Sequence, residues 1–326
     1  MSESLRYIQA VNAALTWALD SRTDTVYFGE DVALPGGPFG ATKGLHKRFG
    51  SDRIFDTPIS ETGFLGMALG AAMTGLRPIA EIMYADFSFV AMDQIVNQIA
   101  TIHYSSAGRW KAPLVIRMQQ GYSPGACAQH SHSPEAYFAH TAGLRVALPA
   151  TPDDAYQMLR TAVVSDDPVV VAEARMLYPT RGPVRTDAPV EEIGGARVVR
   201  PGADVTVVAW SRMVSAALDA AATLAEEGVD IEVVDLRWLN PLDFDTVAAS
   251  VARTGRLVVA HEANLTGGFG AEIAARAAAE CFADLRAPVA RVAAPDVPMP
   301  AAPALQAVVV PEAATVADAV RRTVRA

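Results

Sequence analysis

The chain has 326 residues, of which 51% are hydrophobic and 19% are charged, and its formal net charge is −9. This length favours about two domains, and the apolar content supplies a core for each, which excludes a disordered chain. The acidic balance and the lack of any run of Lys and Arg argue against a nucleic-acid-binding surface.

The cysteines and the apolar stretches indicate the cellular compartment in which the protein is expected. Cys127 and Cys281 have neither metal-site nor disulfide spacing, which is typical of a reducing cytosol. The first ten residues lack the regions of a signal peptide, and the longest apolar stretch, residues 64–76, is too short to span a membrane. We therefore expect a cytoplasmic protein that does not interact with membranes.

The first half of the chain alternates between predicted strands and helices. An amphipathic helix is predicted over residues 4–20, because its apolar residues fall on one face. In chain order there follow a strand (25–31), a helix (42–49), a strand (53–56), an apolar helix from the 55–63 stretch to near Gly75, a strand (78–84), a helix (87–103), two strands (113–118 and 144–149), a helix (152–164) and a strand (167–173). The alternation predicts an α/β fold with a mostly parallel sheet and helices on both faces.

The second half begins after a change in character. Residues 178–200 contain several prolines and little periodicity, which indicates a linker. A second set of elements follows, with strands predicted at 204–210, 231–236 and 256–262 and helices at 213–228 and 241–254. We therefore predict one domain over residues 1–180, a linker over 181–200, and a smaller C-terminal α/β domain over 201–326.

Glu61 lies at the start of the predicted apolar helix, in the stretch FDTPISETG of residues 55–63. One interpretation is an acid in the first helical turn that complements the helix dipole, which contributes about 0.3–1 kcal/mol. The other is a catalytic carboxylate, because a helix that is apolar on all sides is buried and a buried carboxylate is costly unless it is paired. Spacing alone leaves both open.

A loop rich in Gly, Pro and Ser carries His130 and His132 after a predicted strand. Loops at the carboxyl ends of parallel strands are where α/β sheets place ligands. The alternatives are exposed loop histidines, half of a metal site, or a nucleophilic pair of Cys127 with His130. Phe87, at a strand-to-helix junction, is either a core aromatic or a ring that stacks on a planar ligand.

The glycine-rich stretch GGFG, residues 267–270, follows a predicted strand and begins a helix. A dinucleotide-binding fingerprint needs a third glycine where this chain has Ile273, so we interpret the stretch as a tight start of a helix. No phosphate-binding loop of the P-loop type occurs in the sequence.

Several longer stretches occur in order from about residue 5 to the C-terminus. They are GEDV (29–32), TKGL and FGSDRIFDTPISETG (42–63), GLRPIAE (75–81), DFSFVAMDQIVN (86–97), QHSHSPE (129–135), HTAGLRV (140–146), DLRWLNPLD (235–243) and HEANLTGGFGAEI (261–273). With them the chain resembles the beta subunit of the decarboxylating component of 2-oxo acid dehydrogenase complexes. This is the pyruvate and branched-chain type, with a transketolase-like fold.

The resemblance implies a function that is shared between chains. It implies an oxidoreductase that decarboxylates a 2-oxo acid on thiamine diphosphate and passes the acyl group to a lipoyl domain of an acyltransferase core. The alpha subunit would hold the diphosphate and Mg²⁺, the beta subunit the aminopyrimidine, in a heterotetramer of two alpha and two beta chains. In agreement, this sequence has no GDG followed by a downstream Asn, the diphosphate and Mg²⁺ signature of thiamine enzymes.

The resemblance also assigns residues to roles. It implies that Glu61 faces N1′ of the pyrimidine and shares a proton with it, and that Glu30 is an acid that supports Glu61. Phe87 matches the aromatic that packs against the pyrimidine ring, and His130 matches the histidine that acts on the intermediate and its passage to the lipoyl group. Asp296 matches a docking contact for the acyltransferase core.

Some positions depart from the family or leave alternatives open. His132 stands where the family usually has Gln, and a second imidazole there would affect the access of the substrate or of the lipoyl group that accepts the acyl group. Some members carry a potassium loop, which would here fall on Leu114, Ala162, Ser165 and Asp167. Alternatives are the C-terminal half of a split transketolase-type enzyme, which Thr62 disfavours because Gln usually follows the glutamate there, and an acyl-transfer subunit with a non-lipoyl acceptor. A non-catalytic scaffold would not need Glu61, Phe87 and His130 together.

Overall fold

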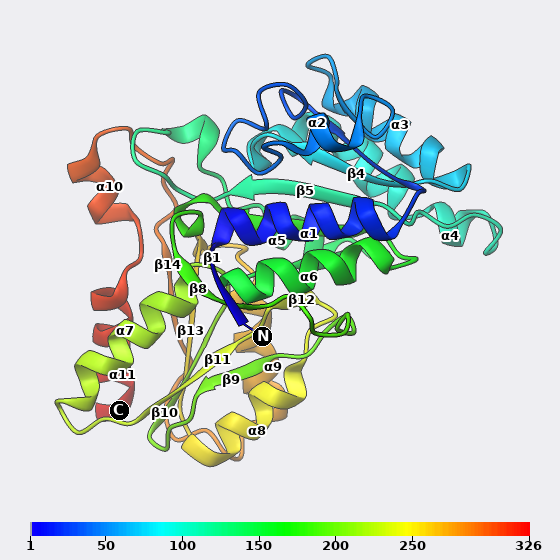
Figure 1. Ribbon diagram of the computed structural model, residues 1–326. Helices are drawn as coiled ribbons and strands as arrows, with labels where there is room; N and C mark the ends of the chain where they lie inside the picture. Colours follow the sequence, from blue (N-terminus) through cyan, green and yellow to red (C-terminus); the bar gives the residue numbers. More distant parts are fainter. Residues whose placement is uncertain (1) are drawn as a thin grey trace. The chain divides into compact units, whose positions relative to one another are not determined.

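The computed structural model describes residues 2–326, which form two compact units (Figure 1). The first unit contains the chain up to Gln120 together with Tyr137–Ile193, and the second contains Gly121–Ala136 and Gly194–Ala326. No helix among the described residues combines the length and the apolar character that a membrane span requires.

The first unit alternates strands and helices as the sequence predicts. Its elements are β1 (Ser2–Arg6), α1 (Tyr7–Ser21), β2 (Thr25–Gly29), α2 (Leu45–Phe49), β3 (Ile54–Asp56), α3 (Glu61–Met73), β4 (Arg77–Ile82), the 3-10 helix η1 (Ala85–Ala91), the π-helix η2 (Asp93–Ile99), α4 (Ile102–Ser105), β5 (Val115–Gln120), α5 (Glu135–His140), β6 (Arg145–Ala147), α6 (Pro152–Val164), β7 (Val169–Ala174), the 3-10 helix η4 (Arg175–Leu177) and β8 (Arg181–Arg185).

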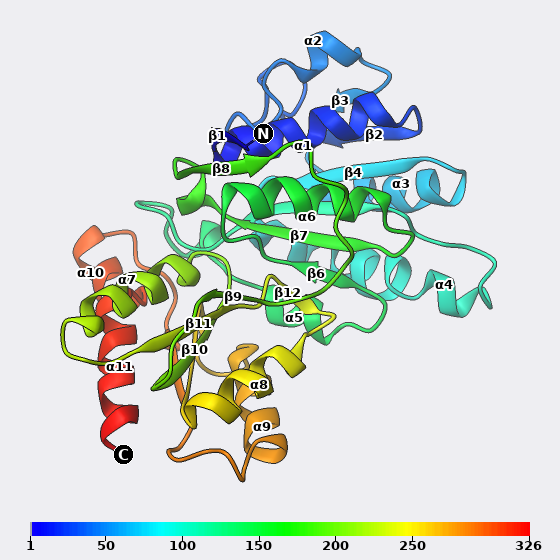
Figure 2. The same cartoon turned by 60° about the horizontal axis from the view of Figure 1, so that its bottom comes forward.

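The strands of the first unit form a parallel sheet in the order β6-β7-β5-β4-β2-β3. Helices α1 and α6 pack on one face, while α3, η1 and η2 cover the other (Figure 2). Every residue of β2, β5 and β7 is buried, as expected of strands covered on both faces. The predicted fold class is confirmed for this unit.

Two predicted segments of this unit differ from the structure. The helix predicted over 87–103 is divided into η1, η2 and α4, because its backbone changes from 3-10 to π to α hydrogen bonding along the segment. Residues 181–185, predicted as linker, form β8, which pairs with the N-terminal β1 in antiparallel register from Ser2↔Arg185 to Arg6↔Arg181. This pairing joins two ends of the unit that are remote in sequence, so local periodicity could not indicate it.

Four polar side chains cross the middle of the apolar sheet. Arg117 on β5 donates to Glu173 on β7 through Nε (2.8 Å) and Nη2 (2.7 Å), and to Glu81 on β4 through Nη1 (2.5 Å). Tyr27 on β2 donates to Glu81 as well. Burial and the Glu81 carboxylate raise the pKa of Tyr27 well above its usual range, so the hydroxyl stays protonated as a donor. All four side chains are buried, and we call them the sheet network.

Gly29 is the last residue of β2, and it lies so close to β4 that no side chain fits there. A Cβ there would lie 2.6 Å from the carbonyl oxygen of Glu81, which belongs to the backbone and cannot move aside. We therefore expect Gly29→Ala to lower the free energy of unfolding by roughly 1–3 kcal/mol, as overpacked sites do. Gly70→Ala is the matched control, because a Cβ there meets nothing within 4 Å and Ala favours a helix interior. Equal denaturation midpoints for wild type and Gly29→Ala would contradict this.

The second unit contains a five-stranded sheet. Its elements are the 3-10 helix η3 (Ala128–His130), β9 (Arg197–Arg200), β10 (Val205–Ala209), α7 (Met213–Ala225), β11 (Ile231–Asp235), β12 (Trp238–Asn240), α8 (Phe244–Thr254), β13 (Leu257–Asn264), α9 (Gly270–Glu280), β14 (Ala290–Ala294), α10 (Pro303–Val309) and α11 (Ala313–Arg325). The order is β14-β13-β10-β11-β9, parallel except for β9, with α7 and α11 on one face and α8 and α9 on the other (Figure 1). The C-terminal α/β fold is thus confirmed.

Candidate active site

The loops after β2 and β3 bring two acids of the first unit together. The carbonyl oxygen of Gly29 accepts a hydrogen bond from the Thr57 N–H (2.9 Å), and Asp56 Oδ1 accepts one from the Ala33 N–H (2.7 Å). These two bonds join the segment after β2, which contains Glu30, to the segment that leads into Glu61. As a result the two glutamates, which are far apart in sequence, form a carboxyl pair.

Glu61 is the first residue of α3 and is only 6% exposed. The helix that it begins is apolar nearly all round, and its buried residues include Phe64, Leu65 and Ala68. A carboxylate at this position benefits from the helix dipole while it is shielded from water. The geometry therefore combines the two interpretations that the sequence left open. The catalytic role itself stays a prediction.

Glu30 is 7% exposed and lies in hydrogen-bonding contact with the Glu61 carboxyl. Burial and then the nearby Glu61 carboxylate raise the pKa of Glu30 to about 7. Its Oε1 is buried with no hydrogen-bond partner among the described residues, and the same holds for Thr57 Oγ1. A proton can therefore be held by this pair near neutral pH, and unpaired polar atoms remain for a ligand.

The raised pKa of Glu30 gives stability a defined pH dependence. An unfolded Glu titrates near 4.5 and the folded one near 7, so the folded state binds more protons between these values, and stability falls as pH rises through that window. Glu30→Gln removes this loss. We expect its melting temperature, relative to wild type, to rise by roughly 2 °C or more between pH 5 and pH 8 in thermal unfolding. Glu272→Gln on the exposed side of α9 should show no such trend; a constant offset for Glu30→Gln would contradict the assignment.

Phe87 lies on η1 and is half-buried. Its ring makes an edge contact with Tyr84, with the centroids 5.8 Å apart. Tyr84 in turn accepts a hydrogen bond from Arg175 Nη1 (3.0 Å) and makes an edge contact with Phe39. The ring of Phe87 is thus supported by a fixed aromatic neighbour and retains exposed surface. Its contact with a pyrimidine stays a prediction.

His130 ends η3 and belongs to the second unit, as does the rest of the segment 121–136. It is half-buried, His132 is exposed, and Cys127 is a free cysteine with a positive φ of 47°. Among residues 2–326 no group of three or more His, Cys, Asp or Glu side chains is placed to hold a metal ion.

The glycine-rich stretch before α9 packs against a histidine of its own unit. A Cβ on Gly268 would lie 2.5 Å from His261 Cε1, and one on Gly270 would lie 2.6 Å from His261 Cδ2. His261 is fully buried and stacks on Trp210 at 5.2 Å, and burial lowers its pKa to about 4, so the ring is neutral. These glycines therefore make room for an imidazole where α9 begins.

One residue of the predicted potassium loop, Ser165, accepts a hydrogen bond from the side chain of Arg77. Arg77 Nη1 donates to the carbonyl oxygen of Ser165 (2.6 Å), and the carbonyl oxygen of Leu114 accepts the Val169 N–H (3.0 Å). The Ser165 hydroxyl donates to the carbonyl oxygen of Asp167 (2.9 Å). Potassium binding stays a prediction. A bound ion would have to share these carbonyl oxygens with the hydrogen bonds that they already accept.

Comparison with known proteins agrees with this architecture. The chain matches the family models for the transketolase pyrimidine binding domain over residues 3–181 and the transketolase C-terminal domain over residues 194–316. The pyruvate dehydrogenase E1 component subunit beta of Leifsonia xyli is 44% identical, covering 98% of this chain and 95% of that protein. The chain belongs to the family of 2-oxo acid dehydrogenase E1 beta subunits.

Two further relatives extend the comparison. The 3-methyl-2-oxobutanoate dehydrogenase subunit beta of Mycobacterium tuberculosis is 44% identical over 100% of this chain and 93% of that protein. A solved structure of a split-gene transketolase, an inactive beta4 tetramer, has a TM-score of 0.81 at 26% identity and covers 98% of each chain. The resemblance drawn from the sequence is confirmed, and the family is one of thiamine-diphosphate-dependent enzymes.

Sequence reasoning missed the polar residues that surround the predicted ones. Asp56 and Thr57 tie the Glu30 loop in place, and the sheet network lies beside it across the strands. A signal existed for the network, because charged residues in the middle of apolar strands, such as Glu81 and Arg117, need a buried partner. Nothing local to the sequence indicated which partner each would have.

Proposed function

We propose that this chain is the beta subunit of a 2-oxo acid dehydrogenase that decarboxylates pyruvate or a branched-chain 2-oxo acid on thiamine diphosphate and transfers the acyl group to a lipoyl domain. The observation that carries the proposal is the buried carboxyl pair of Glu30 and Glu61, inside a segment that matches a pyrimidine binding domain. Relatives that are 44% identical over nearly the whole chain carry the names of pyruvate and 3-methyl-2-oxobutanoate dehydrogenase beta subunits.

The residues present fit a thiamine pyrimidine. Glu61 would hold or donate a proton at N1′, Glu30 would keep that proton in the pair near neutral pH, and Phe87 would support the ring face. The buried position of both acids excludes water, and burial raises the pKa of Glu30. When bound, thiamine diphosphate supplies the electron sink for the electrons left by departing CO₂. His130 would act on the acyl group during its transfer.

The proposal requires other chains. An alpha subunit would hold the diphosphate and Mg²⁺ in a heterotetramer of two alpha and two beta chains in the cytoplasm, and a lipoylated acyltransferase core would accept the acyl group, with Asp296 as a docking contact. The related split transketolase is a tetramer of beta chains that is inactive, which supports the need for a partner here. That relative also favours a second candidate, the C-terminal half of a split transketolase-type enzyme.

Reconstitution tests the proposal. The chain is co-expressed with an alpha subunit of its family and supplied with thiamine diphosphate, Mg²⁺ and a panel of linear and branched 2-oxo acids, while reduction of an artificial electron acceptor is followed. We expect turnover of a 2-oxo acid by the pair and none by the chain alone. Full activity of the chain alone would overturn the shared site. Transketolase activity of the pair, together with no turnover of any 2-oxo acid, would establish the second candidate instead.

A further inference from the structure

The segment Gly121–Ala136, which carries His130, is held by residues from the second unit at both of its ends. Between these ends it contains η3 and no other regular element before α5. A backbone hydrogen bond from the Gly121 N–H to the carbonyl oxygen of His132 (2.9 Å) joins the start of the segment to the residues that follow His130.

Glu262, on β13, holds the first end. Its Oε1 accepts a hydrogen bond from the backbone N–H of Tyr122 (2.5 Å). Gly121 has a positive φ of 79°, and a Cβ there would overlap Glu262 Oε1. The backbone thus turns directly onto the carboxylate, in a conformation and a space that only glycine fits.

Arg212, which follows β10, holds the other carboxylate oxygen. Its Nε donates to Glu262 Oε2 (2.6 Å), and both side chains are about one-tenth exposed. The guanidinium also donates to the carbonyl oxygen of Pro311 (2.8 Å) and lies 5.7 Å from the centroid of the Tyr122 ring. The Arg212 guanidinium, which is itself bonded to the backbone at Pro311, therefore holds the Glu262 carboxylate in place. A charge-assisted pair of this kind is directional.

The last part of the segment has its own attachment. Trp210 Nε1 donates to Glu135 Oε1 (3.2 Å), and the Trp210 ring stacks on His261. Near the start, Gln306 Nε2 donates to the carbonyl oxygen of Ser123 (3.3 Å). The holding residues Trp210, Arg212 and Glu262 all lie at the carboxyl ends of the neighbouring parallel strands β10 and β13.

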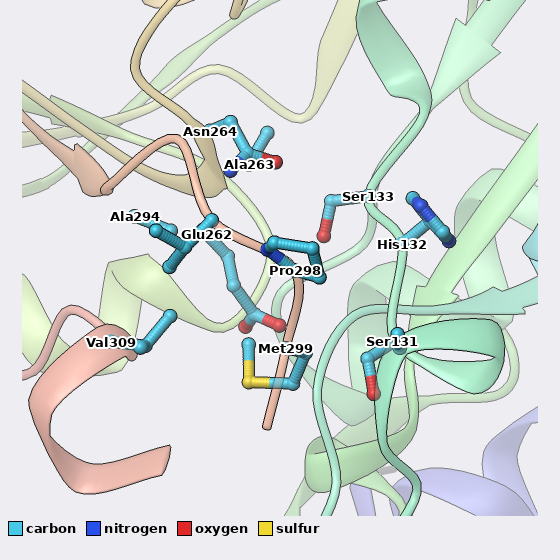
Figure 3. Close-up of a pocket in the computed structure, with 12 residues that line it drawn as sticks. Ser131, His132, Ser133, Glu262, Ala263, Asn264, Ala294, Pro298, Met299 and Val309 are labelled. Atoms are coloured by element: carbon cyan, nitrogen blue, oxygen red, sulfur yellow. The ribbon is translucent and has the colours of Figure 1, made fainter. Parts of the chain in front are cut away.

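Residues 131–133 of the segment border a cavity of about 50 Å³. Figure 3 shows Ser131, His132 and Ser133 along this space, with Glu262 on its wall and Pro298 and Met299 beside it. The volume has room for only a few water molecules. The segment thus lines a small cavity between its attached start and end.

We propose that Glu262 and Arg212 are positioning residues for His130: they fix the start of its segment, and through it the imidazole that acts in acyl transfer. The inference rests on the role that the proposed function gives to His130. It assigns these two residues no contact with substrate.

Activity measurements on the reconstituted alpha–beta complex test the proposal by non-additivity. Glu262→Ala should lower the rate of acyl transfer to a lipoyl domain roughly 10- to 100-fold, as expected from a displaced catalytic group. In the double variant with His130→Ala the rate should equal that of His130→Ala alone, because Glu262 acts only through His130. Glu262→Gln keeps an acceptor for the Tyr122 N–H, so its rate of acyl transfer should lie between those of wild type and Glu262→Ala. Glu272→Ala, an exposed acid on α9, is the matched control and should retain full transfer.

Hydrogen exchange provides a readout that does not depend on activity. Glu262→Ala and Arg212→Met should each raise amide exchange across residues 121–136, and Glu272→Ala should not. Unchanged exchange, or a double variant whose loss is the product of the two single losses, would overturn the proposal. If His130→Ala itself transfers the acyl group normally while exchange rises in Glu262→Ala, the segment is held as described but the role of His130 in the proposed function fails.

Discussion

The Glu61→Gln variant, reconstituted with an alpha subunit, should lose about 10²- to 10⁴-fold in the rate of 2-oxo acid decarboxylation, the usual contribution of a positioned acid–base group. The amide keeps the size of the side chain and its place in the first turn of α3, but it cannot carry a titratable proton. Reduction of an artificial acceptor measures this step without the lipoyl domain, so the loss should appear in that assay.

Two comparisons make the result specific. Glu226→Gln, at an exposed position after α7, should turn over like wild type. Thermal unfolding of Glu61→Gln should show a folded chain, because removing one acid from a buried pair relieves repulsion. Equal turnover of Glu61→Gln and wild type would show that the carboxyl pair is structural.

Arg117→Met should be the most destabilising substitution considered. It removes the cation between Glu81 and Glu173 and leaves two carboxylates fully buried without a positive partner. Loss of one partner from a buried ion pair costs about 3–5 kcal/mol, and here one cation serves two acids. Urea denaturation of the chain should therefore show a large fall in the midpoint, or no folded baseline at all.

Two further substitutions, one in a surface ion pair and one of an uncharged residue of the sheet network, give reference values for the loss of stability in Arg117→Met. Arg276 pairs with Glu280 across one turn of α9 at a partly exposed position, and its guanidinium lies 4.0 Å from the centroid of the Phe244 ring, so Arg276→Met should cost about 1 kcal/mol. Tyr27→Phe removes one neutral donor to Glu81 and should cost about 1–3 kcal/mol. If Arg117→Met lowers the midpoint no more than Arg276→Met does, the sheet network does not stabilise the fold as described.

The sequence predicts the bounds of an element correctly where its capping residues and apolar periodicity all lie within a few neighbouring residues. Helix α6 begins and ends where predicted, because Thr151 accepts the Asp154 N–H, Pro152 occupies the first turn, and one face is apolar. The segment 87–103 lacked such signals and divides into three helical types. The antiparallel pair of β1 and β8 depends on residues more than 170 positions apart, as its register from Ser2↔Arg185 shows.

The candidate site shows the same limit. Glu61 could be singled out because an acid at the start of an apolar helix is unusual, but its pairing with Glu30 follows from hydrogen bonds between two loops that no spacing rule relates. The role of each acid came from the family resemblance and not from periodicity. The domain bounds at 180 and 200 stay a prediction, while residues 121–136 group with the second unit through bonds such as Tyr122 N–H to Glu262.

The sheet network also constrains how the sequence can change. Tyr27, Glu81, Arg117 and Glu173 come from four adjacent strands, and each makes hydrogen bonds to its neighbours in that row. A replacement at one position leaves a buried donor or acceptor at another, so single changes are disfavoured while compensated multiple changes are tolerated. Among homologous chains these positions should consequently covary, and a relative without the arginine should also lack the acids on either side of it.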